Sequence, residues 1–286
     1  MAVVAGVVAL AAIGAGIVLV AGGGPSRAEF AADADAVCAE GNDALDLDEP
    51  TSYPELATAS TTLAGGIRDQ VNALGSLDAP GEAAGEAVDA FLAGLDRTAA
   101  AAGDLGDVAA SPDDPATARA AGEVDSSFQA VVDDGEAFGF RECSLGLRPG
   151  VEAVLGGSHA VVKASFVASA EAACREAVRA LDAVPFPEDT AASFAGFLDE
   201  TQAVFDTMIA EIAALAVPPG DGDEVAAMMA ALEAVAVKSG EAVDAAYADD
   251  FSRFDALDQE VAQLWTAADA KLDAYGLAAC GSNFGL

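Results

Sequence analysis

This chain of 286 residues contains four cysteines, the residue type here with the most specific chemistry: Cys38, Cys143, Cys174 and Cys280. Cysteine serves as a zinc ligand, as a redox nucleophile or as half of a disulfide, and the first two roles usually place two cysteines in a Cys-x-x-Cys spacing. The sequence contains no such spacing, and its single histidine, His159, lies in the stretch between the second and third cysteines. We therefore predict that all four thiols form structural disulfide bonds.

Paired carboxylates are the other groups that could do chemistry, because they can act as general acid and base or bind cations. The clusters are Asp33/Asp35, Asp46 to Glu49, Asp113-Asp114, Asp221/Asp223/Glu224 and Asp249-Asp250. Most stand at expected helix ends or turns, where acidic side chains cap helices and interact with helix dipoles; loose divalent-cation binding is the alternative. A di-metal bundle site needs Glu-x-x-His pairs, which one histidine cannot supply, and hydrolase, nucleotide-binding and calcium-loop motifs do not occur. The sequence predicts no catalytic residue, no metal site and no bound cofactor.

The two halves of the chain carry the same pattern. Phe30, Cys38, Glu40, Leu45 and Asp46 recur 136 positions later as Phe166, Cys174, Glu176, Leu181 and Asp182. Positions 56–80 recur at an offset of 138 and positions 88–143 at an offset of 137, where the segment FGFREC is matched by YGLAAC. The offset changes only between expected helices, as loop insertions in a duplicated unit produce. The pattern predicts an internal duplication.

This repeat selects one of the three pairings that four cysteines allow. Each copy has one cysteine in its first expected helix and one just after its fourth. In an up-down-up-down bundle these two points lie at the same end, within reach of a disulfide bond. We therefore predict the pairs Cys38–Cys143 and Cys174–Cys280.

The segments that carry the cysteines and carboxylates have the pattern of amphipathic helices. Apolar residues recur every three or four positions, most clearly at Phe251, Phe254, Leu257, Val261, Leu264, Ala268, Leu272 and Tyr275. The first helix is expected from Ser26 to Asp46, with Ser26 and Glu29 as a capping box. The hydrophobic content of 53%, with only 6% aromatic residues, favours closely packed helices over sheets. The predicted fold is all-α: two tandem antiparallel four-helix bundles, residues 26–143 and 164–286, joined by a linker at 144–163.

Residues 1–25 form a separate N-terminal segment. From Ala2 to Ala21 it is almost wholly apolar, and about 20 apolar residues are enough to cross a membrane as a helix. We predict a transmembrane anchor at residues 2–21. A cleaved signal peptide is the alternative, because Val20 and Gly22 are small and two positions apart and could form a signal-peptidase site. No Lys or Arg precedes the apolar run, which departs from the positive-inside rule.

The net charge is −36, from 12 basic and 48 acidic side chains. Residues 28–143 carry −21 and residues 164–280 carry −17, so the charge is a property of both copies, whereas the linker is not acidic. Such a field repels nucleic acid and anionic membrane surfaces. Cations and basic proteins remain as partners, and a merely solvated surface is the alternative.

The bulkiest apolar residues of the second copy could line a pocket. They are Phe205, Met208, Met228, Met229, Trp265 and Tyr275. Core filling is one interpretation, and an apolar pocket between helices, enlarged because the opposing positions are alanine, is the other.

The first-helix cysteine and the terminal YGLAAC segment resemble a class of uncharacterised secreted or membrane-anchored helical-bundle proteins of actinobacteria, the high-GC Gram-positive bacteria. The segment FGFREC departs from that pattern at Phe140. The resemblance implies an all-helical fold and a place outside the cytoplasm, and it implies no activity.

Together these features predict a membrane-anchored, extracytoplasmic, acidic binding module that is not an enzyme. A structural spacer of the cell envelope and a carboxylate-based enzyme are the alternatives. Disulfide bonds and an apolar N-terminal segment are typical of proteins that fold in an oxidising compartment.

Overall fold

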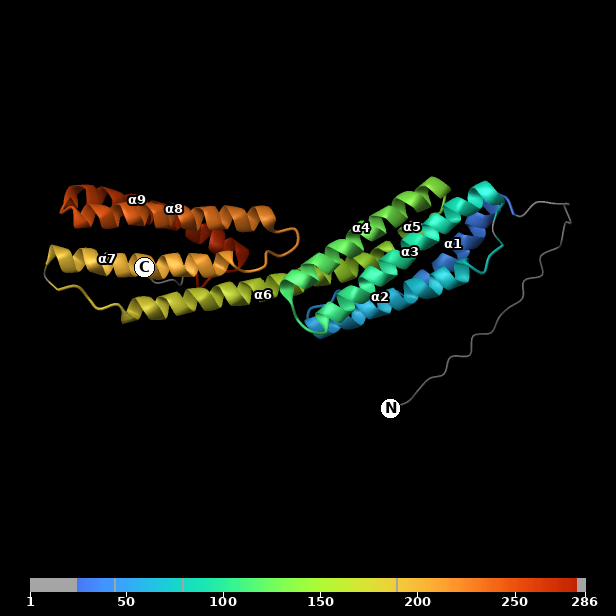
Figure 1. Ribbon diagram of the computed structural model, residues 1–286, viewed down its shortest axis with the longest axis horizontal. Coiled ribbons are helices and arrows are strands. Elements are labelled where there is room, and N and C mark those ends of the chain that lie inside the picture. Colours follow the sequence, from blue (N-terminus) through green and yellow to red (C-terminus); the bar gives the residue numbers. More distant parts are fainter. Residues whose placement is uncertain (1–24, 44, 79, 189, 282–286) are drawn as a thin grey trace, which may run out of the picture.

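The structure, a computed structural model, describes residues 25–43, 45–78, 80–188 and 190–281. These residues form helices and no β-strand, so the predicted all-α class is confirmed for this part of the chain. The helices are α1 (Arg27–Asp43), α2 (Tyr53–Leu74), α3 (Glu82–Ala109), α4 (Asp114–Phe138), α5 (Glu142–Leu145), α6 (Arg148–Ala183), α7 (Ala191–Ala213), α8 (Gly222–Tyr247) and α9 (Phe251–Tyr275). Figure 1 shows an elongated molecule in which α6 runs lengthwise from one group of helices into the other.

Local sequence signals explain several helix ends. Before α1, the backbone N–H of Ser26 donates to Glu29 Oε2 (2.9 Å) and the N–H of Glu29 donates to Ser26 Oγ (3.3 Å), which confirms the predicted capping box. α1 ends at Asp43, before the predicted end at residue 46. α4 and α9 each end at a glycine in the left-handed conformation, Gly139 with φ 103° and Gly276 with φ 98°, which glycine adopts without a steric penalty.

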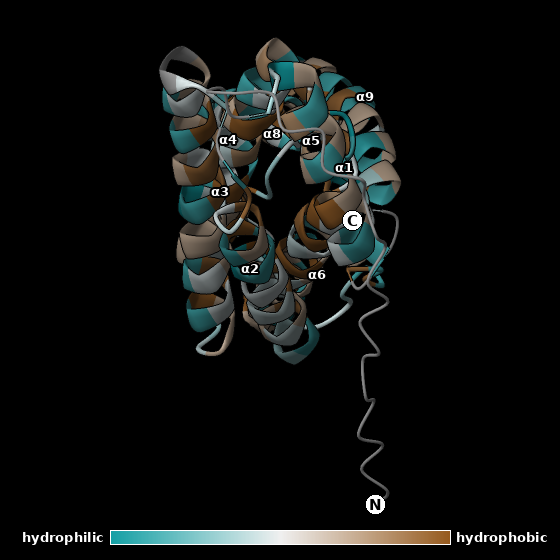
Figure 2. Cartoon of the chain, turned by 90° about the vertical axis from the view of Figure 1, so that its right-hand side faces the viewer, coloured by the Kyte–Doolittle hydropathy of each residue, from teal (hydrophilic) through white to brown (hydrophobic). Residues whose placement is uncertain are grey.

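The N-terminal unit, residues 27–157, consists of α1 to α5 and the first half of α6. α3 packs against α2 and α4, and α6 packs against both α2 and α4. The core includes Leu63 from α2, Phe91 from α3, Phe128 from α4 and Val151 from α6. Figure 2 views this unit from its end and shows hydrophobic and hydrophilic residues in alternating bands along the helices. Because Val151 lies in this core and α6 contacts α2 and α4, the first half of α6 is part of this unit.

The C-terminal unit, residues 166–281, consists of the second half of α6 with α7, α8 and α9. α7 packs against α6 and α8, and α8 packs against α9. The core includes Phe166 from α6, Met208 from α7, Leu232 from α8 and Leu272 from α9. The border between the two units thus falls inside α6, and not in a connection between separate bundles.

Residues 144–163, for which the sequence predicts a linker, are helical from Arg148 onward. Pro149 stands in the first turn of α6, where its missing N–H is not needed for a helical hydrogen bond. Gly157 lies inside α6 because the chain passes very close there: a Cβ atom on it would lie 2.7 Å from the backbone N and O of Pro50. The proline and the glycine therefore support a packed helix at this point, and the predicted linker is corrected to a shared helix.

Each unit is closed by one disulfide bond. Cys38 bonds to Cys143 with their Cα atoms 5.0 Å apart, and Cys174 bonds to Cys280 with their Cα atoms 5.1 Å apart. This confirms the pairing that the repeat predicts. All four cysteines are fully buried, so each disulfide is part of the core that it closes.

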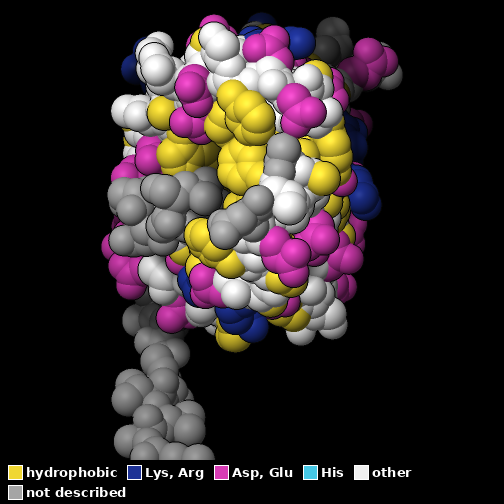
Figure 3. All heavy atoms as spheres, turned by 90° about the vertical axis from the view of Figure 1, so that its left-hand side faces the viewer, with side chains coloured by type: hydrophobic (Ala, Val, Ile, Leu, Met, Phe, Trp, Pro, Cys, Tyr) yellow, Lys and Arg dark blue, Asp and Glu magenta, His cyan; other side chains and the backbone are white. Residues whose placement is uncertain are grey.

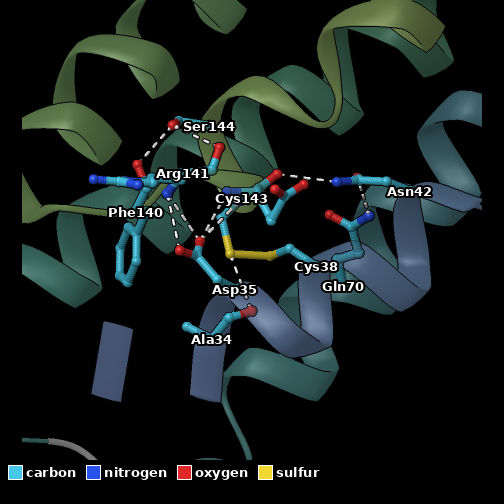
Figure 4. The surroundings of a disulfide bond; sticks show 10 residues. Ala34, Asp35, Cys38, Asn42, Gln70, Phe140, Arg141, Cys143 and Ser144 are labelled. Carbon is cyan, nitrogen blue, oxygen red and sulfur yellow. Dashed lines mark hydrogen bonds between the residues drawn. A yellow bond between two sulfur atoms is a disulfide. The ribbon is translucent and has the colours of Figure 1, made fainter. Parts of the chain in front are cut away.

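An acidic side chain holds the segment that carries the second cysteine of each pair. Asp35 Oδ1 accepts hydrogen bonds from the backbone N–H groups of Arg141 and Glu142, both at 2.9 Å (Figure 4). Glu171, 136 positions after Asp35, accepts one from the N–H of Ala279 at 3.0 Å through Oε1. This backbone hydrogen bond, with a smaller contribution from Arg175, lowers the pKa of Glu171. The same device therefore fixes both closing segments.

Aromatic contacts also recur at the repeat positions. Phe30 and Phe138 meet edge to face with their ring centroids 6.0 Å apart, and Phe166 and Tyr275 meet in the same way at 5.7 Å. Phe138 and Tyr275 are separated by the same offset of 137 as Cys143 and Cys280. The contacts at the closed ends thus follow the sequence repeat.

Residues 2–21, the predicted membrane anchor or signal segment, lie outside the described residues. Within the part that the structure describes, one helical stretch, Glu142–Ala183, is long and apolar enough to cross a membrane by length and composition. Its buried residues include Val154 in the N-terminal core and Phe166 in the C-terminal core. Packing inside the protein therefore accounts for much of its apolar character.

Candidate functional site

An apolar groove of about 610 Å³ lies between α7 and α9 of the C-terminal unit, over α8, and is called the α7/α9 groove below. Its lining consists of Leu198, Thr201, Gln202 and Phe205 from α7, Val235, Ser239, Ala242 and Val243 from α8, Phe254, Asp258, Val261, Ala262, Trp265, Thr266 and Asp269 from α9, with Leu181 and Gly281. Figure 3 views the end of the molecule at which α7 begins and shows hydrophobic side chains gathered there with acidic side chains around them.

Helical periodicity explains why one side of α9 forms a wall. Its lining residues fall at positions 254, 258, 261, 262, 265, 266 and 269, each three or four positions from another, so they share one helix face. Phe205 on α7 and Trp265 on α9 meet with ring centroids 5.3 Å apart. Ala242 and Ala262 also line the groove, and their small side chains fill little of it. The groove therefore combines large aromatic walls with small residues.

The six residues predicted to line an apolar pocket divide into two groups. Phe205 and Trp265 line the groove. Met208 and Met228 are 1% exposed and fill the core, and Met229 packs against it. Tyr275 binds a carboxylate outside the groove. The structure thus places a cavity between helices of the C-terminal unit, while four of the six residues make other contacts.

Two carboxylates, Asp258 and Asp269, stand on the α9 wall. Burial, and the nearby charge of Asp273, raise the pKa of Asp269. Its Oδ1 is buried and has no hydrogen-bond partner among the described residues. An unpaired buried acceptor is costly, and a bound molecule with an N–H group or a positive charge would satisfy it.

A second cluster surrounds Asp221, which is 8% exposed at the start of α8. Its Oδ2 accepts hydrogen bonds from the Tyr275 hydroxyl at 2.7 Å and the Lys163 ammonium at 2.9 Å, and His159 Nε2 lies 2.9 Å from Oδ1. Burial alone would raise the pKa of Asp221, but the hydrogen bonds from Tyr275, Lys163 and His159 outweigh it and lower the pKa to about 2. A carboxylate kept ionised in this way serves as an anchor between helices, not as a general base.

Sequence reasoning missed the Asp221 cluster because it placed His159 in a linker and Asp221 among the helix caps. His159 and Lys163 instead lie on α6, where they face the start of α8. One signal in the sequence pointed to the cluster: at an offset of 137, Asp221 is matched by Ala84, so an acid in one half of the chain corresponds to a small apolar residue in the other.

The same comparison of the two copies would have found the polar groove residues. Thr201 stands where the first copy has Leu63, and Asp269 stands where it has Val132. Both first-copy residues are buried core residues. At these two positions the C-terminal unit therefore has polar side chains lining a groove where the N-terminal unit has buried apolar ones.

Within the described ranges, no group of three or more His, Cys, Asp or Glu side chains is placed to hold a metal ion. The α7/α9 groove, with its two carboxylates, is thus the feature that bears most directly on function. Comparison of the chain with models of protein families, with curated proteins and with solved structures finds no match.

Proposed function

We propose that this chain is a non-enzymatic binding module that works outside the cytoplasm, held at a membrane by residues 2–21 and built from two copies of a four-helix unit. The observation that carries the proposal is the α7/α9 groove. Its volume of about 610 Å³ falls within the range of roughly 300–1,000 Å³ typical of ligand sites. Apolar and aromatic walls with a few polar groups are the usual composition of such sites.

The charges of the groove and of the chain favour a ligand with an apolar body and a positive group. Asp258 and Asp269 stand on the groove wall, and the net charge of the whole chain is −36. A field of this sign attracts cations, polyamines and basic proteins and repels nucleic acid. The proposed ligand class is therefore amphipathic and cationic.

The compartment and the duplication rest on the cysteines and their surroundings. Two fully buried disulfides are typical of proteins outside the reducing cytoplasm. The disulfides, the carboxylate contacts of Asp35 and Glu171, and the aromatic pairs recur at an offset of 136 or 137. These recurring contacts support a duplicated unit in which α6 supplies the first helix of the second copy.

Trp265 offers a direct test because it is the single tryptophan of the chain and lines the groove. The full chain in phosphatidylcholine vesicles would be titrated with divalent cations, polyamines, basic amphipathic peptides and envelope lipids, at low and high salt, while its fluorescence is recorded. We expect a saturable change with cationic amphipathic ligands that survives high salt, since a bound apolar group is not screened. A fluorescence that none of these compounds alters would contradict binding in the groove.

A structural spacer is the second candidate, and α6 is the observation that favours it. This helix of 36 residues belongs to the cores of both units, so it would hold them at a fixed separation. At 1.5 Å per residue it is about 54 Å long. A chain that binds nothing in the titration and keeps this separation would be a spacer.

A further inference from the structure

The N-terminal unit has a helix where the C-terminal unit has its groove. The first half of α6 packs against both α2 and α4. The repeat matches α2, α3 and α4 with α7, α8 and α9, because their core residues recur at offsets of 137 and 138. The space between α7 and α9, over α8, therefore corresponds to the space that α6 fills between α2 and α4.

The residues around Gly150 on α6 correspond, through the repeat, to residues that line the groove. A Cβ atom on Gly150 would lie 3.6 Å from Leu63 Cδ1 and 3.0 Å from the carbonyl oxygen of Leu45. The repeat counterparts of these two residues are Thr201 and Leu181, and both line the groove. The groove is thus the surface on which α6 lies in the other copy.

Two residues that are buried in the N-terminal unit are more exposed at the corresponding positions of the C-terminal unit. Leu63 and Val124 are both 0% exposed in the N-terminal unit. Their counterparts in the C-terminal unit, Thr201 and Val261, are partly exposed. A helix seated between α7 and α9 would cover these side chains in the same way.

The charges of the two surfaces indicate which kind of helix fits. α4 presents Ala121 and Val132, which are 4% and 3% exposed, in the N-terminal unit. Their counterparts on α9 are Asp258 and Asp269. Residues 144–163, which include the first half of α6, already carry two basic side chains and one acidic side chain. A helix for the acidic groove should be at least as basic, because carboxylates near a desolvated surface favour opposite charge.

We infer that the α7/α9 groove binds an α-helix of a partner protein, with an apolar stripe flanked by Lys or Arg, in the position that α6 occupies between α2 and α4. This inference rests on the proposed binding function and names the class of its ligand. Insertion of an amphipathic helix into an apolar groove is a common mode of peptide recognition. The apolar stripe would cover Trp265 and Phe205, and the basic flank would pair with Asp258 and Asp269.

The test uses a synthetic peptide of residues 144–163, which contains the helix that fills the equivalent place. The peptide has no tryptophan or tyrosine, so the fluorescence of Trp265 in the full chain reports its binding directly. We expect saturable binding to the full chain in phosphatidylcholine vesicles. A peptide with Val151→Asp and Val154→Asp should bind at least tenfold more weakly, and one with Glu152→Lys should bind more tightly at low salt.

Two variants of α7 provide a matched pair. Thr201 and Thr207 both donate from their hydroxyl to the carbonyl four residues earlier at 2.8 Å, and only Thr201 lines the groove. We expect Thr201→Lys to weaken peptide binding at least tenfold and Thr207→Lys to leave it unchanged. Equal effects of the two variants would overturn the inference.

The outcomes separate the inference from the proposed function. If Trp265 responds to small cationic ligands and not to the peptide, the helix inference fails and the binding function stands. If Trp265 responds to neither, both fail. If the peptide binds only to a chain that ends at Gly281, the groove belongs to the chain's own residues 282–286, and the partner helix is ruled out.

Discussion

At the scale of single residues, Asp221 links three helices, because it stands at the start of α8 and its partners come from α6 and α9. Its pKa is lowered to about 2, so its contribution to stability is fully present above the pKa of about 3.9 in the unfolded chain and is lost as the pH falls toward 2. We expect Asp221→Asn to lower the free energy of unfolding by about 2 kcal/mol at neutral pH. Urea unfolding should show that the difference in free energy of unfolding between the variant and the unchanged protein is smaller near pH 2.5 than at neutral pH.

Asp223, exposed on the same turn of α8, is the control for this prediction. Its exchange to asparagine should change the free energy of unfolding by less than about 0.5 kcal/mol, as is usual for surface positions. A stability difference for Asp221→Asn that stays constant over the pH range would show that its ionised form is not what ties the helices together.

Residues with a local signature or a recurring spacing could be predicted, whereas acids whose role comes only from contacts between helices were missed. The capping pair Ser26 and Glu29 follows from its spacing alone, and the cysteine pairing follows from the repeat. Asp221 and Asp269 are chemically ordinary acids in the sequence. Their importance depends on which helix faces come together, which no local pattern contains.

At the scale of elements, α6 depends on the close approach of Gly157 to the backbone of Pro50. We expect Gly157→Ala to destabilise the protein by about 1–3 kcal/mol, because the backbone of Pro50 cannot move aside as a flexible side chain would. Gly240→Ala in α8 is the matched change, since no atom lies within 4 Å of a Cβ there. It should stabilise the protein by up to about 1 kcal/mol through helix propensity. Thermal unfolding of the two variants measures both stability changes. Destabilisation by Gly240→Ala would contradict the view that the space around the added Cβ decides the sign.

The same helix shows why the predicted linker was wrong. Proline and paired glycines are frequent in turns, so residues 144–163 lack the local signals of a helix interior. Val151 and Val154 are nonetheless almost fully buried, and the burial of these side chains between α2 and α4 outweighs the weak helix propensity of glycine. The apolar stripe from Phe251 to Tyr275, in contrast, predicts a helix where the structure has α9, Phe251–Tyr275.

At the scale of the whole molecule, α6 couples the two units because its side chains belong to both cores. We expect the protein to unfold in one calorimetric transition. Ala164, exposed between the two sets of core residues, is the position at which a proline would break this coupling. Ala164→Pro removes one helical hydrogen bond and costs about 3 kcal/mol or more, so the single transition should split into two.

Ala164→Ser is the control, because it keeps the backbone N–H and should leave one transition. A single transition in Ala164→Pro, only shifted to lower temperature, would mean that contacts other than α6 couple the units. Two transitions in the unchanged protein would mean that the units unfold independently.

The two disulfides also decide how the molecule responds to a pulling force applied at its ends. Tension passes from Cys38 directly to Cys143 and from Cys174 directly to Cys280, so both enclosed loops are shielded from stretching. The load between them falls on residues 143–174, most of which form α6. Extending residues 143–174 from 1.5 Å to about 3.5 Å per residue gains only roughly 60 Å. Force spectroscopy should record this short extension in the oxidised molecule and one several times longer after reduction.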